Sequence, residues 1–195
     1  MTNSNDLVVS DYSPEWPRSF ESLKEIYEHA LGDVILDIYH VGSTSVVGLA
    51  AKPVIDIDLV IRDRTVLSQV ISGLAALGYE HRGDLGIPDR EAFGRTSDQV
   101  PYDGPRRVWP KHNLYCCHRG CVPLKNHLAL RDYLRDHPEK AREYGELKKR
   151  FVTEANGDID RYVELKTPFI LGVLWEMGLD RDDLRRIDKQ NRKRK

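Results

Sequence analysis

The sequence contains few cysteines, no long apolar run and no segment that resembles a leader peptide. Three cysteines among 195 residues are an odd number that does not form a complete set of disulfides, so a reducing compartment is the simplest location. No apolar stretch approaches the ~18 residues that cross a bilayer, and the first six residues include neither a basic region nor an apolar segment. We therefore expect a cytoplasmic protein without a membrane partner.

Net charge is also nearly absent, which argues against broad electrostatic attraction to nucleic acid. The chain carries 30 Lys and Arg against 31 Asp and Glu, a formal net charge of −1, whereas nucleic-acid-binding domains are typically basic. The charge is uneven, because residues 181–195 hold eight basic and three acidic residues. Such an end is typical of a solvated terminus, so we expect residues 181–195 to form a basic, disordered tail. An arm that attracts phosphate is the alternative.

Strand-like and helix-like segments alternate along the rest of the chain, as in a mixed α/β (α+β) fold. Apolar residues recur every three or four positions from Trp16 to Ala30, which predicts the first helix. Segments rich in β-branched and aromatic residues predict strands. The expected strands are residues 34–41, 54–61, 90–96 and 113–118; the later helices are expected at 64–77, at 123–136, and from about 138 and 158 onward.

No repeat, low-complexity linker or abrupt change of composition divides the chain. We therefore expect an α/β core over residues 1–120, in which a mixed sheet is flanked by helices. A helical C-terminal portion, residues 121–180, is expected to pack on the same core and to precede the basic tail. The sequence does not indicate an oligomeric state.

Residues 42–45, Gly-Ser-Thr-Ser, place a glycine and three hydroxyl groups between two expected strands. Glycine allows the backbone to approach a ligand, successive amides can form an anion-binding nest, and hydroxyls are short donors. This is not a Walker P-loop, because no Lys-Ser/Thr pair follows Gly48. A Gly-Ser turn is weak evidence on its own, since most such turns only reverse the chain.

Two aspartates on the following strand strengthen the evidence for a phosphate site. Strand alternation places Asp56 and Asp58 on one face together with Val54 and Val60. Adjacent carboxylates with apolar neighbours repel each other unless they are protonated or bridged by a cation. Mg²⁺ commonly combines one or two carboxylates with substrate phosphates. The turn and the strand together therefore predict a magnesium and phosphate site, with a solvated polar face as the alternative.

Several motifs between residues 10 and 176 together make the sequence resemble a known family. They are Tyr12-Ser-Pro-Glu-Trp-Pro17, His40-Val-Gly-Ser-Thr-Ser45, Gly48-Leu-Ala-Ala-Lys-Pro53, Asp56-Ile-Asp58, Gly86-Ile-Pro-Asp-Arg90, His112-Asn-Leu114, Arg131-Asp-Tyr-Leu-Arg135 and residues 144–148. The chain resembles the GrpB-type family, which also occurs fused behind dephospho-CoA kinase. The resemblance implies the nucleotidyltransferase fold of the DNA polymerase beta superfamily, whose signature is Gly-Ser followed by Asp-x-Asp on the next strand.

The resemblance also implies roles for individual residues. Gly42 and Ser43 would hold the triphosphate of a nucleotide, while Asp56 and Asp58 would ligate Mg²⁺ and serve as catalytic carboxylates.

Nucleotidyltransferases generally use a third carboxylate on a neighbouring strand to activate the acceptor hydroxyl. The matching strand here reads Asn-Leu-Tyr-Cys-Cys at residues 113–117, and many family members have histidine where this chain has Tyr115. His112, Tyr115 and Glu91 are the candidate proton acceptors, and the sequence does not choose among them.

Basic residues outside these motifs offer further contacts for phosphate. Arg131 and Arg135 are four apart on one expected helix face, and arginine binds phosphate bidentately; a solvated helix face is the alternative. Lys148 and Lys166 raise similar possibilities, and His40 is either a core histidine or a phosphate partner. The candidate phosphate-binding residues are His40, Gly42, Ser43, Thr44, Ser45, Lys52, Arg131 and Arg135.

The first hypothesis is a Mg²⁺-dependent transferase that moves a nucleotidyl group from a nucleoside triphosphate to a small-molecule acceptor. Arg131 or Lys52 would neutralise charge in the transition state. The second hypothesis is a non-catalytic module that binds a phosphate, nucleotide or CoA-type ligand, or that acts as a folding partner. The missing third carboxylate favours the second hypothesis.

Overall fold

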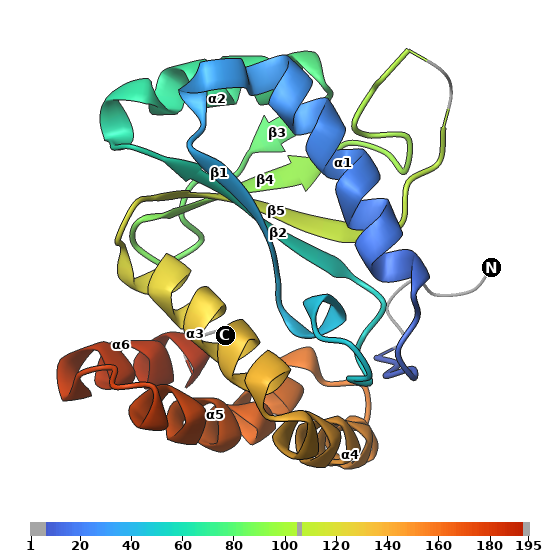
Figure 1. Cartoon of the computed structure of the whole chain (residues 1–195), viewed down its shortest axis with the longest axis vertical. Helices are drawn as coiled ribbons and strands as arrows, with labels where there is room; N and C mark the ends of the chain where they lie inside the picture. Colours follow the sequence, from blue (N-terminus) through green and yellow to red (C-terminus); the bar gives the residue numbers. More distant parts are fainter. Residues whose placement is uncertain (1–6, 105–106, 193–195) are drawn as a thin grey trace.

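The computed structural model describes residues 7–104 and 107–192, and in this part of the chain a five-stranded sheet lies between two groups of helices (Figure 1). The strands are β1 (Asp37–Val41), β2 (Ile55–Ile61), β3 (Tyr79–His81), β4 (Arg90–Arg95) and β5 (His112–His118). The helices are α1 (Glu15–Leu31), α2 (Leu67–Ala76), α3 (Val122–Asp136), α4 (Pro138–Ala155), α5 (Ile159–Glu176) and α6 (Arg181–Arg192). Three short 3₁₀ turns, η1 (Gly32–Val34), η2 (Ser43–Ser45) and η3 (Arg64–Val66), connect them.

The sheet is mixed, with the order β1-β2-β5-β4-β3. The central pair, β2 and β5, is parallel, and the other three neighbouring pairs are antiparallel. Because parallel neighbours need a crossover, the chain passes through α2, β3 and β4 before it returns beside β2. This topology confirms the expected mixed sheet flanked by helices.

Alternation along β2 separates the hydrophobic core from the polar face, as the sequence predicts. Ile55, Ile57 and Leu59 are at most 1% exposed and pack in one cluster with apolar residues of α1 and α2. Burial of each side chain contributes about 2 kcal/mol. The opposite face carries Asp56 and Asp58, so one seven-residue strand both anchors the core and presents two carboxylates.

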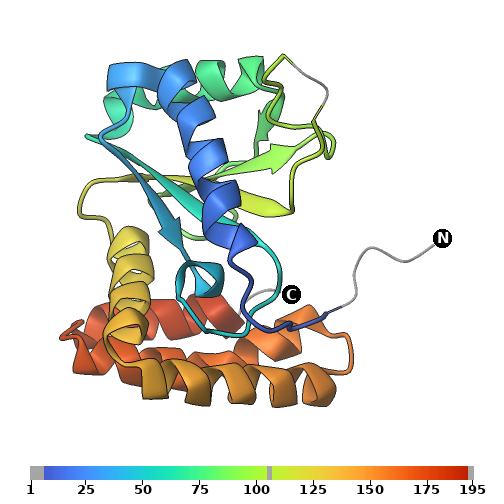
Figure 2. The ribbon, with the colours of Figure 1, turned by 45° about the vertical axis from the view of Figure 1, so that its right-hand side comes forward.

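The helices α3 to α6 lie on the other side of the molecule from α1 and α2, as both views of the ribbon show (Figures 1 and 2). The turn after β1 contacts this group, because Val46 and Leu49 pack with Tyr133 and Tyr144. The expected cap of α5 is confirmed, since the Asp158 carboxylate accepts a hydrogen bond from the Arg161 amide. None of the helices in the described ranges is long and apolar enough to cross a membrane.

Two segments differ from the sequence prediction. The strand expected at residues 34–41 begins at Asp37, because the η1 turn extends the end of α1 through Val34. Residues 181–192 of the expected disordered tail form the helix α6, whose Ile187 side chain is 3% exposed. The basic composition did not predict this amphipathic helix, because its stability comes from packing against the rest of the protein rather than from intrinsic helix propensity. Residues 193–195 lie outside the described residues.

Candidate functional site

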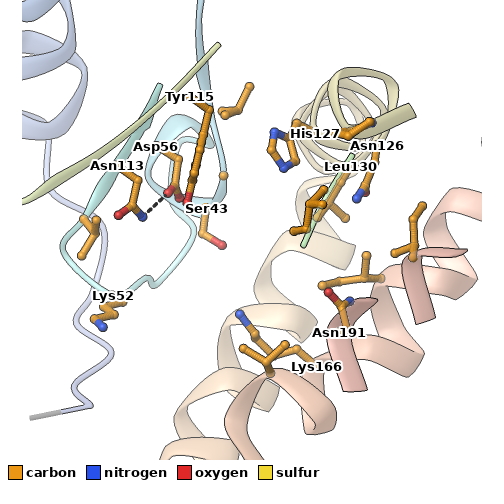
Figure 3. A pocket seen from close by; sticks show the side chains of 18 of the residues that line it. Ser43, Lys52, Asp56, Asn113, Tyr115, Asn126, His127, Leu130, Lys166 and Asn191 are labelled. Atoms are coloured by element: carbon orange, nitrogen blue, oxygen red, sulfur yellow. Dashed lines mark hydrogen bonds between the residues drawn. The ribbon is translucent and has the colours of Figure 1, made fainter. Parts of the chain in front are cut away.

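The turn between β1 and β2 is fixed by hydrogen bonds and by one glycine. Gly42 has φ = 67°, a region that favours glycine, and a Cβ at this position would overlap the Asp56 carboxylate. The Ser45 hydroxyl donates to the Gly42 carbonyl at 2.6 Å, and the Thr44 hydroxyl donates to the Val54 carbonyl at 3.2 Å. The Ser43 side chain lines a cleft beside Asp56 (Figure 3).

The two aspartates of β2 differ in their partners. Asp56 accepts a hydrogen bond from the Asn113 amide of β5 at 2.7 Å. Burial raises the pKa of Asp56, and the Asn113 hydrogen bond and the nearby His127 partly oppose this. Asp58 is 0% exposed, and its Oδ2 accepts a hydrogen bond from Nδ1 of His127 at 2.7 Å. Within the described ranges the other oxygen of Asp58, Oδ1, is buried without a partner.

His127 reaches Asp58 from α3, on the far side of the cleft. Because its Nδ1–H donates to a carboxylate, Nε2 is the ring nitrogen that remains for other contacts. Burial acts to lower the pKa of His127, but the charge and hydrogen bond of Asp58 outweigh it, so the pKa is raised. The ring lies 6.3 Å from the Tyr115 ring, and the two define one end of the cleft (Figure 3).

The cleft has a volume of about 380 Å³ and runs between the sheet and the helical portion. Ser43, Asp56 and Tyr115 lie on the sheet side, while His127 and Lys166 lie on the helical side (Figure 3). Helix α6 also contributes, since the side chains of Gln190 and Asn191 line the cleft. The site is therefore shared by the two halves of the chain.

Buried charged side chains with incomplete hydrogen bonding lie in and beside this cleft. Among the described residues, four buried side-chain nitrogen or oxygen atoms lack a partner, and three of them are Asp58 Oδ1, Arg90 Nε and Lys148 Nζ. Arg90 and Lys148 line the cleft and are 5% and 2% exposed. Burial and the nearby Lys166 hold the pKa of Lys148 well below its ordinary value, while Asp56 acts in the opposite direction. Uncompensated buried charges are costly, so the cleft is suited to a ligand that carries both a cation and anionic groups.

Of the expected phosphate-binding residues, Gly42, Ser43, Thr44 and Lys52 line the cleft. His40, Arg131 and Arg135 instead line a second cavity of about 640 Å³ on the other side of the turn, which Thr44 and Ser45 also border.

The two arginines hold the turn from this second cavity. Arg135 donates two hydrogen bonds to the Ser45 carbonyl at 3.1 and 2.8 Å, and Arg131 donates to the His40 carbonyl at 3.3 Å. Burial, with smaller contributions from Arg135 and Arg131, lowers the pKa of His40 to about 4. These three residues therefore position the turn rather than face the Asp56 carboxylate. The sequence did not predict this, because helix and strand periodicity do not show which side of the turn α3 covers.

The structure also separates His112 from the carboxylates. Alternation along β5 directs Asn113 and Tyr115 toward the cleft, whereas His112 points into the core beneath α1 and α2, where it contacts Tyr79. Glu91 lies on that same core face of β4, bound by Arg64 and His81. Of the three candidate proton acceptors, only Tyr115 faces the cleft.

Among the residues that the structure describes, no third carboxylate lies at the register positions beside the aspartate pair. The register partners of Asp56 and Asp58 are Val41 and Tyr39 on β1, and Asn113 and Tyr115 on β5. No group of three His, Cys, Asp or Glu residues in the described part of the chain could hold a metal ion. The unpartnered Asp58 oxygen and the neighbouring Asp56 nevertheless suit Mg²⁺ whose remaining ligands come from phosphate and water, the donors that this ion prefers.

Sequence reasoning missed the contributions of Arg90 and His127. Arg90 is the last residue of the motif at 86–90, and no role was predicted for it. His127 lies on the helix of Arg131 and Arg135, and only the two arginines were predicted to bind a ligand. A usable signal was present on α3, because Pro123, Asn126, His127 and Leu130 follow the i, i+3, i+4, i+7 spacing of one helix face, and all four line the cleft.

Comparison with known proteins identifies relatives over most of the chain. A family model described as GrpB protein matches residues 6–175. UPF0157 protein YqkA of Bacillus subtilis is 33% identical over 159 residues, which cover 82% of this chain and 43% of that protein. Glutamate-rich protein GrpB of Alkalihalophilus pseudofirmus is 27% identical over 90% of this chain and 98% of its own length. A dephospho-CoA kinase of Mycolicibacterium paratuberculosis is 29% identical over 84% of this chain and 43% of the kinase. The chain thus spans less than half of YqkA and of the kinase.

Solved structures support the same fold. The crystal structure of GrpB from Enterococcus faecalis has a TM-score of 0.72 and 29% identity, over 92% of this chain and 99% of that chain. Cid1 in complex with its short product ApU has a TM-score of 0.56 and 13% identity, over 86% of this chain and 50% of Cid1. At that identity the likeness to Cid1 concerns the fold alone.

Proposed function

This chain belongs to the GrpB family, and from its nucleotidyltransferase-like fold and the charges of its cleft we propose that it transfers a nucleotidyl group from a Mg²⁺-bound nucleoside triphosphate to a small-molecule acceptor. The observation that carries the proposal is a carboxylate and a buried amine on opposite walls of one cleft. Asp56 lines the sheet side, next to the buried Asp58, whose Oδ1 has no hydrogen-bond partner among the described residues. Lys148 lines the helical side, and its Nζ likewise has no hydrogen-bond partner in the described part of the chain. A magnesium-bound triphosphate would supply a partner for each.

The triphosphate would lie between the Gly-Ser turn and the lysines. Ser43 and the amides that follow Gly42 can donate hydrogen bonds to phosphate oxygens. Lys52, on the sheet side, and Lys166, on the helical side, lie at the end of the cleft away from Tyr115 and His127 (Figure 3). Lys148 lines the same cleft from α4. Phosphoryl transfer depends mainly on positioning and on charge stabilisation, which these groups provide.

Asp56 and Asp58 would hold Mg²⁺, which supplies Lewis-acid stabilisation of the charge on the phosphate oxygens. In the transfer, an acceptor hydroxyl oxygen forms a bond to the α-phosphorus. The bond between that phosphorus and the β-phosphate oxygen breaks, pyrophosphate leaves, and the hydroxyl proton passes to water. His127 positions the Asp58 carboxylate through its hydrogen bond.

A second candidate function is nucleotide or phosphate binding without catalysis. The specific observation in its favour is Asn113, which lies on β5 directly beside Asp56 and bonds to it, where a third carboxylate would be expected in a transferase. An amide can position the aspartate but cannot accept the acceptor proton at neutral pH.

The Asp56→Asn variant tests the proposed function by calorimetry with each of the four ribonucleoside triphosphates and Mg²⁺. We expect the wild type to bind at least one of them, and the variant to bind it at least about 10–100-fold more weakly. The exposed Asp33→Asn variant is the matched control. Absence of Mg²⁺-dependent binding of any triphosphate to the wild type would contradict the proposed transfer.

Stability measurements show whether Asp56→Asn remains folded. Asparagine can still accept the Asn113 hydrogen bond. Because burial raises the pKa of Asp56, stability contributed by the neutral carboxyl is lost as pH rises through that pKa, and the amide avoids this loss. We expect the free energy of unfolding near pH 8 to increase by about 1 kcal/mol. Release of pyrophosphate, measured with pooled small-molecule acceptors, then distinguishes transfer from binding alone.

A further inference from the structure

Arg90 is a buried cation whose guanidinium lies over an aromatic ring. It begins β4 opposite Cys117, on the face of the sheet that borders the cleft, and is 5% exposed. Its guanidinium carbon lies 4.2 Å from the centroid of the Tyr115 ring. In the part of the chain that the structure covers, its side chain makes no ion pair or hydrogen bond, and its Nε is buried without a partner.

This arrangement leaves the charge of Arg90 uncompensated. A guanidinium stays protonated in proteins, so Arg90 cannot avoid its burial by losing a proton, as a lysine can. The face of Tyr115 offers a modest cation–π attraction, whereas a buried charge without an anionic partner carries a larger desolvation cost. His127 of the helical wall, with which Arg90 interacts electrostatically, donates a proton to Asp58 and offers Arg90 no negative charge. A ligand anion would supply the missing partner.

The position of Arg90 separates it from the lysines. Arg90 stacks on Tyr115, which lies at the end of the cleft with His127, while Lys52 and Lys166 lie at the other end (Figure 3). Asp56 and Ser43 lie between the two ends (Figure 3). If the triphosphate occupies the lysine end, the acceptor must approach from the Arg90 end, because the reacting α-phosphate lies beside Asp56.

We propose that the acceptor is a small anionic molecule, bearing a carboxylate or a phosphate monoester, whose anionic group is bound by Arg90. The guanidinium carbon lies 4.2 Å from the centroid of the Tyr115 ring, and the planar fork of N–H groups that a guanidinium carries binds carboxylate and phosphate bidentately. Ile87, Val122 and Pro123 line the cleft with Arg90 and offer an apolar surface for the rest of the acceptor. This inference rests on the proposed function, because it names the second substrate of the same site.

Nuclear magnetic resonance of the Arg90 Nε–H group tests the proposal in the wild-type protein. The signal is assigned by its loss in Arg90→Lys. We expect glycerol 3-phosphate, malate or both to shift it in a saturable manner, and glycerol to leave it unchanged. Whichever anion binds identifies phosphate or carboxylate as the recognised group. Arg90→Met should weaken binding of that anion by about 10–100-fold, the loss of a charge-assisted hydrogen bond.

Arg95→Lys is the matched control, since Arg95 lies on the same strand but donates to the carbonyls of Trp109 and Pro110. It should keep the affinity for the anion.

Addition of Mg²⁺ with α,β-methylene-ATP distinguishes this inference from the proposed function. We expect the analogue to bind without displacing the anion from Arg90. If the analogue itself shifts the Arg90 signal and displaces the anion, Arg90 belongs to the nucleotide phosphates and the acceptor assignment is wrong. If a short uridine oligonucleotide shifts the signal and neither small anion does, the acceptor is a polynucleotide, which also overturns the inference. If the analogue does not bind while the anion still does, the proposed function fails and the anion site of Arg90 stands by itself.

Discussion

The hydrogen bonds of His112 determine which of its ring nitrogens carries a proton. Nδ1 lies 2.9 Å from the Pro110 carbonyl oxygen, which can only accept, so Nδ1 is the donor. In the neutral ring Nε2 then accepts from the Tyr79 hydroxyl at 2.6 Å. Tyr79 must in turn accept from Tyr27, 2.6 Å away. This buried chain of polar groups is complete only while His112 is neutral, and it explains why a histidine is stable in the core.

The first prediction at this scale concerns acid stability. Burial, together with Arg95 and against the Pro110 carbonyl, lowers the pKa of His112 to about 4. The unfolded chain takes up a proton at a pKa near 6.5, so this contribution is present above pH 6.5 and is lost as pH falls toward 4. We expect His112 alone to lower the free energy of unfolding by about 2 kcal/mol between pH 7.5 and pH 5. Urea unfolding of wild type and His112→Gln at both pH values measures it. An equal pH dependence in the two proteins would show that the histidine takes up no proton on unfolding.

At the scale of elements, α6 shows that residues 181–192 of the C-terminal segment form a helix rather than the disordered tail that the sequence predicted. Its Ile187 is buried, and Asn191 donates a hydrogen bond to the Thr167 hydroxyl of α5 at 3.1 Å. Both residues line the cleft, so the helix that packs against α5 also completes the site. The docking depends on few apolar side chains in a segment that is otherwise strongly charged.

The prediction for α6 is that Ile187→Asp detaches the helix while the sheet stays folded. A buried carboxylate without a partner costs more than the contacts of one apolar residue, and α6 is too short to be stable alone. We expect the amides of residues 181–192 to exchange hydrogen with solvent faster, and triphosphate affinity to fall about tenfold. Hydrogen exchange and calorimetry measure both. Arg185→Ala, on a side chain that is 76% exposed, is the control, and unchanged exchange in Ile187→Asp would show that α6 is not held by this contact.

The elements themselves show what a single sequence can predict. The face of β2 and the N-cap of α5 follow from local periodicity and capping chemistry, and both are confirmed. The side of the turn on which Arg131 and Arg135 lie does not, because it depends on how α3 crosses the sheet. The partnership of His127 with Asp58 joins residues 69 positions apart. Local signals therefore predict which residues share a face, while only tertiary packing decides which faces meet.

At the scale of the whole molecule, the cleft joins two groups of elements with different charges. The sheet contributes Asp56, with Asp58 buried beside it on β2, and the helices α4 and α5 contribute Lys148 and Lys166. Figure 3 shows Asp56 on the sheet side and Lys166 on the helical side. A ligand that bridges the two would contact both halves of the chain and stabilise the folded protein by mass action. Burial acts on ionisable groups of both walls. It raises the pKa of Asp56 and holds the pKa of Lys148 well below its usual value, so it disfavours the charged form of each group.

The final prediction is that triphosphate binding is coupled to proton uptake at Lys148. A phosphate beside the amine favours the ammonium form and raises its pKa, so near pH 8.5 binding should take up as much as about one proton per ligand. Calorimetry with Mg²⁺ and the bound triphosphate, in Tris and in Hepes, measures this number, because the two buffers differ in ionisation enthalpy. Lys148→Met should abolish the uptake and, by removing a buried unpaired amine, should leave the free protein equally or more stable. Lys149→Met is the matched control, since the neighbouring lysine of α4 is more exposed and pairs with Asp11 and Glu146. Equal proton uptake in wild type and Lys148→Met would show that the lysine does not contact the phosphates.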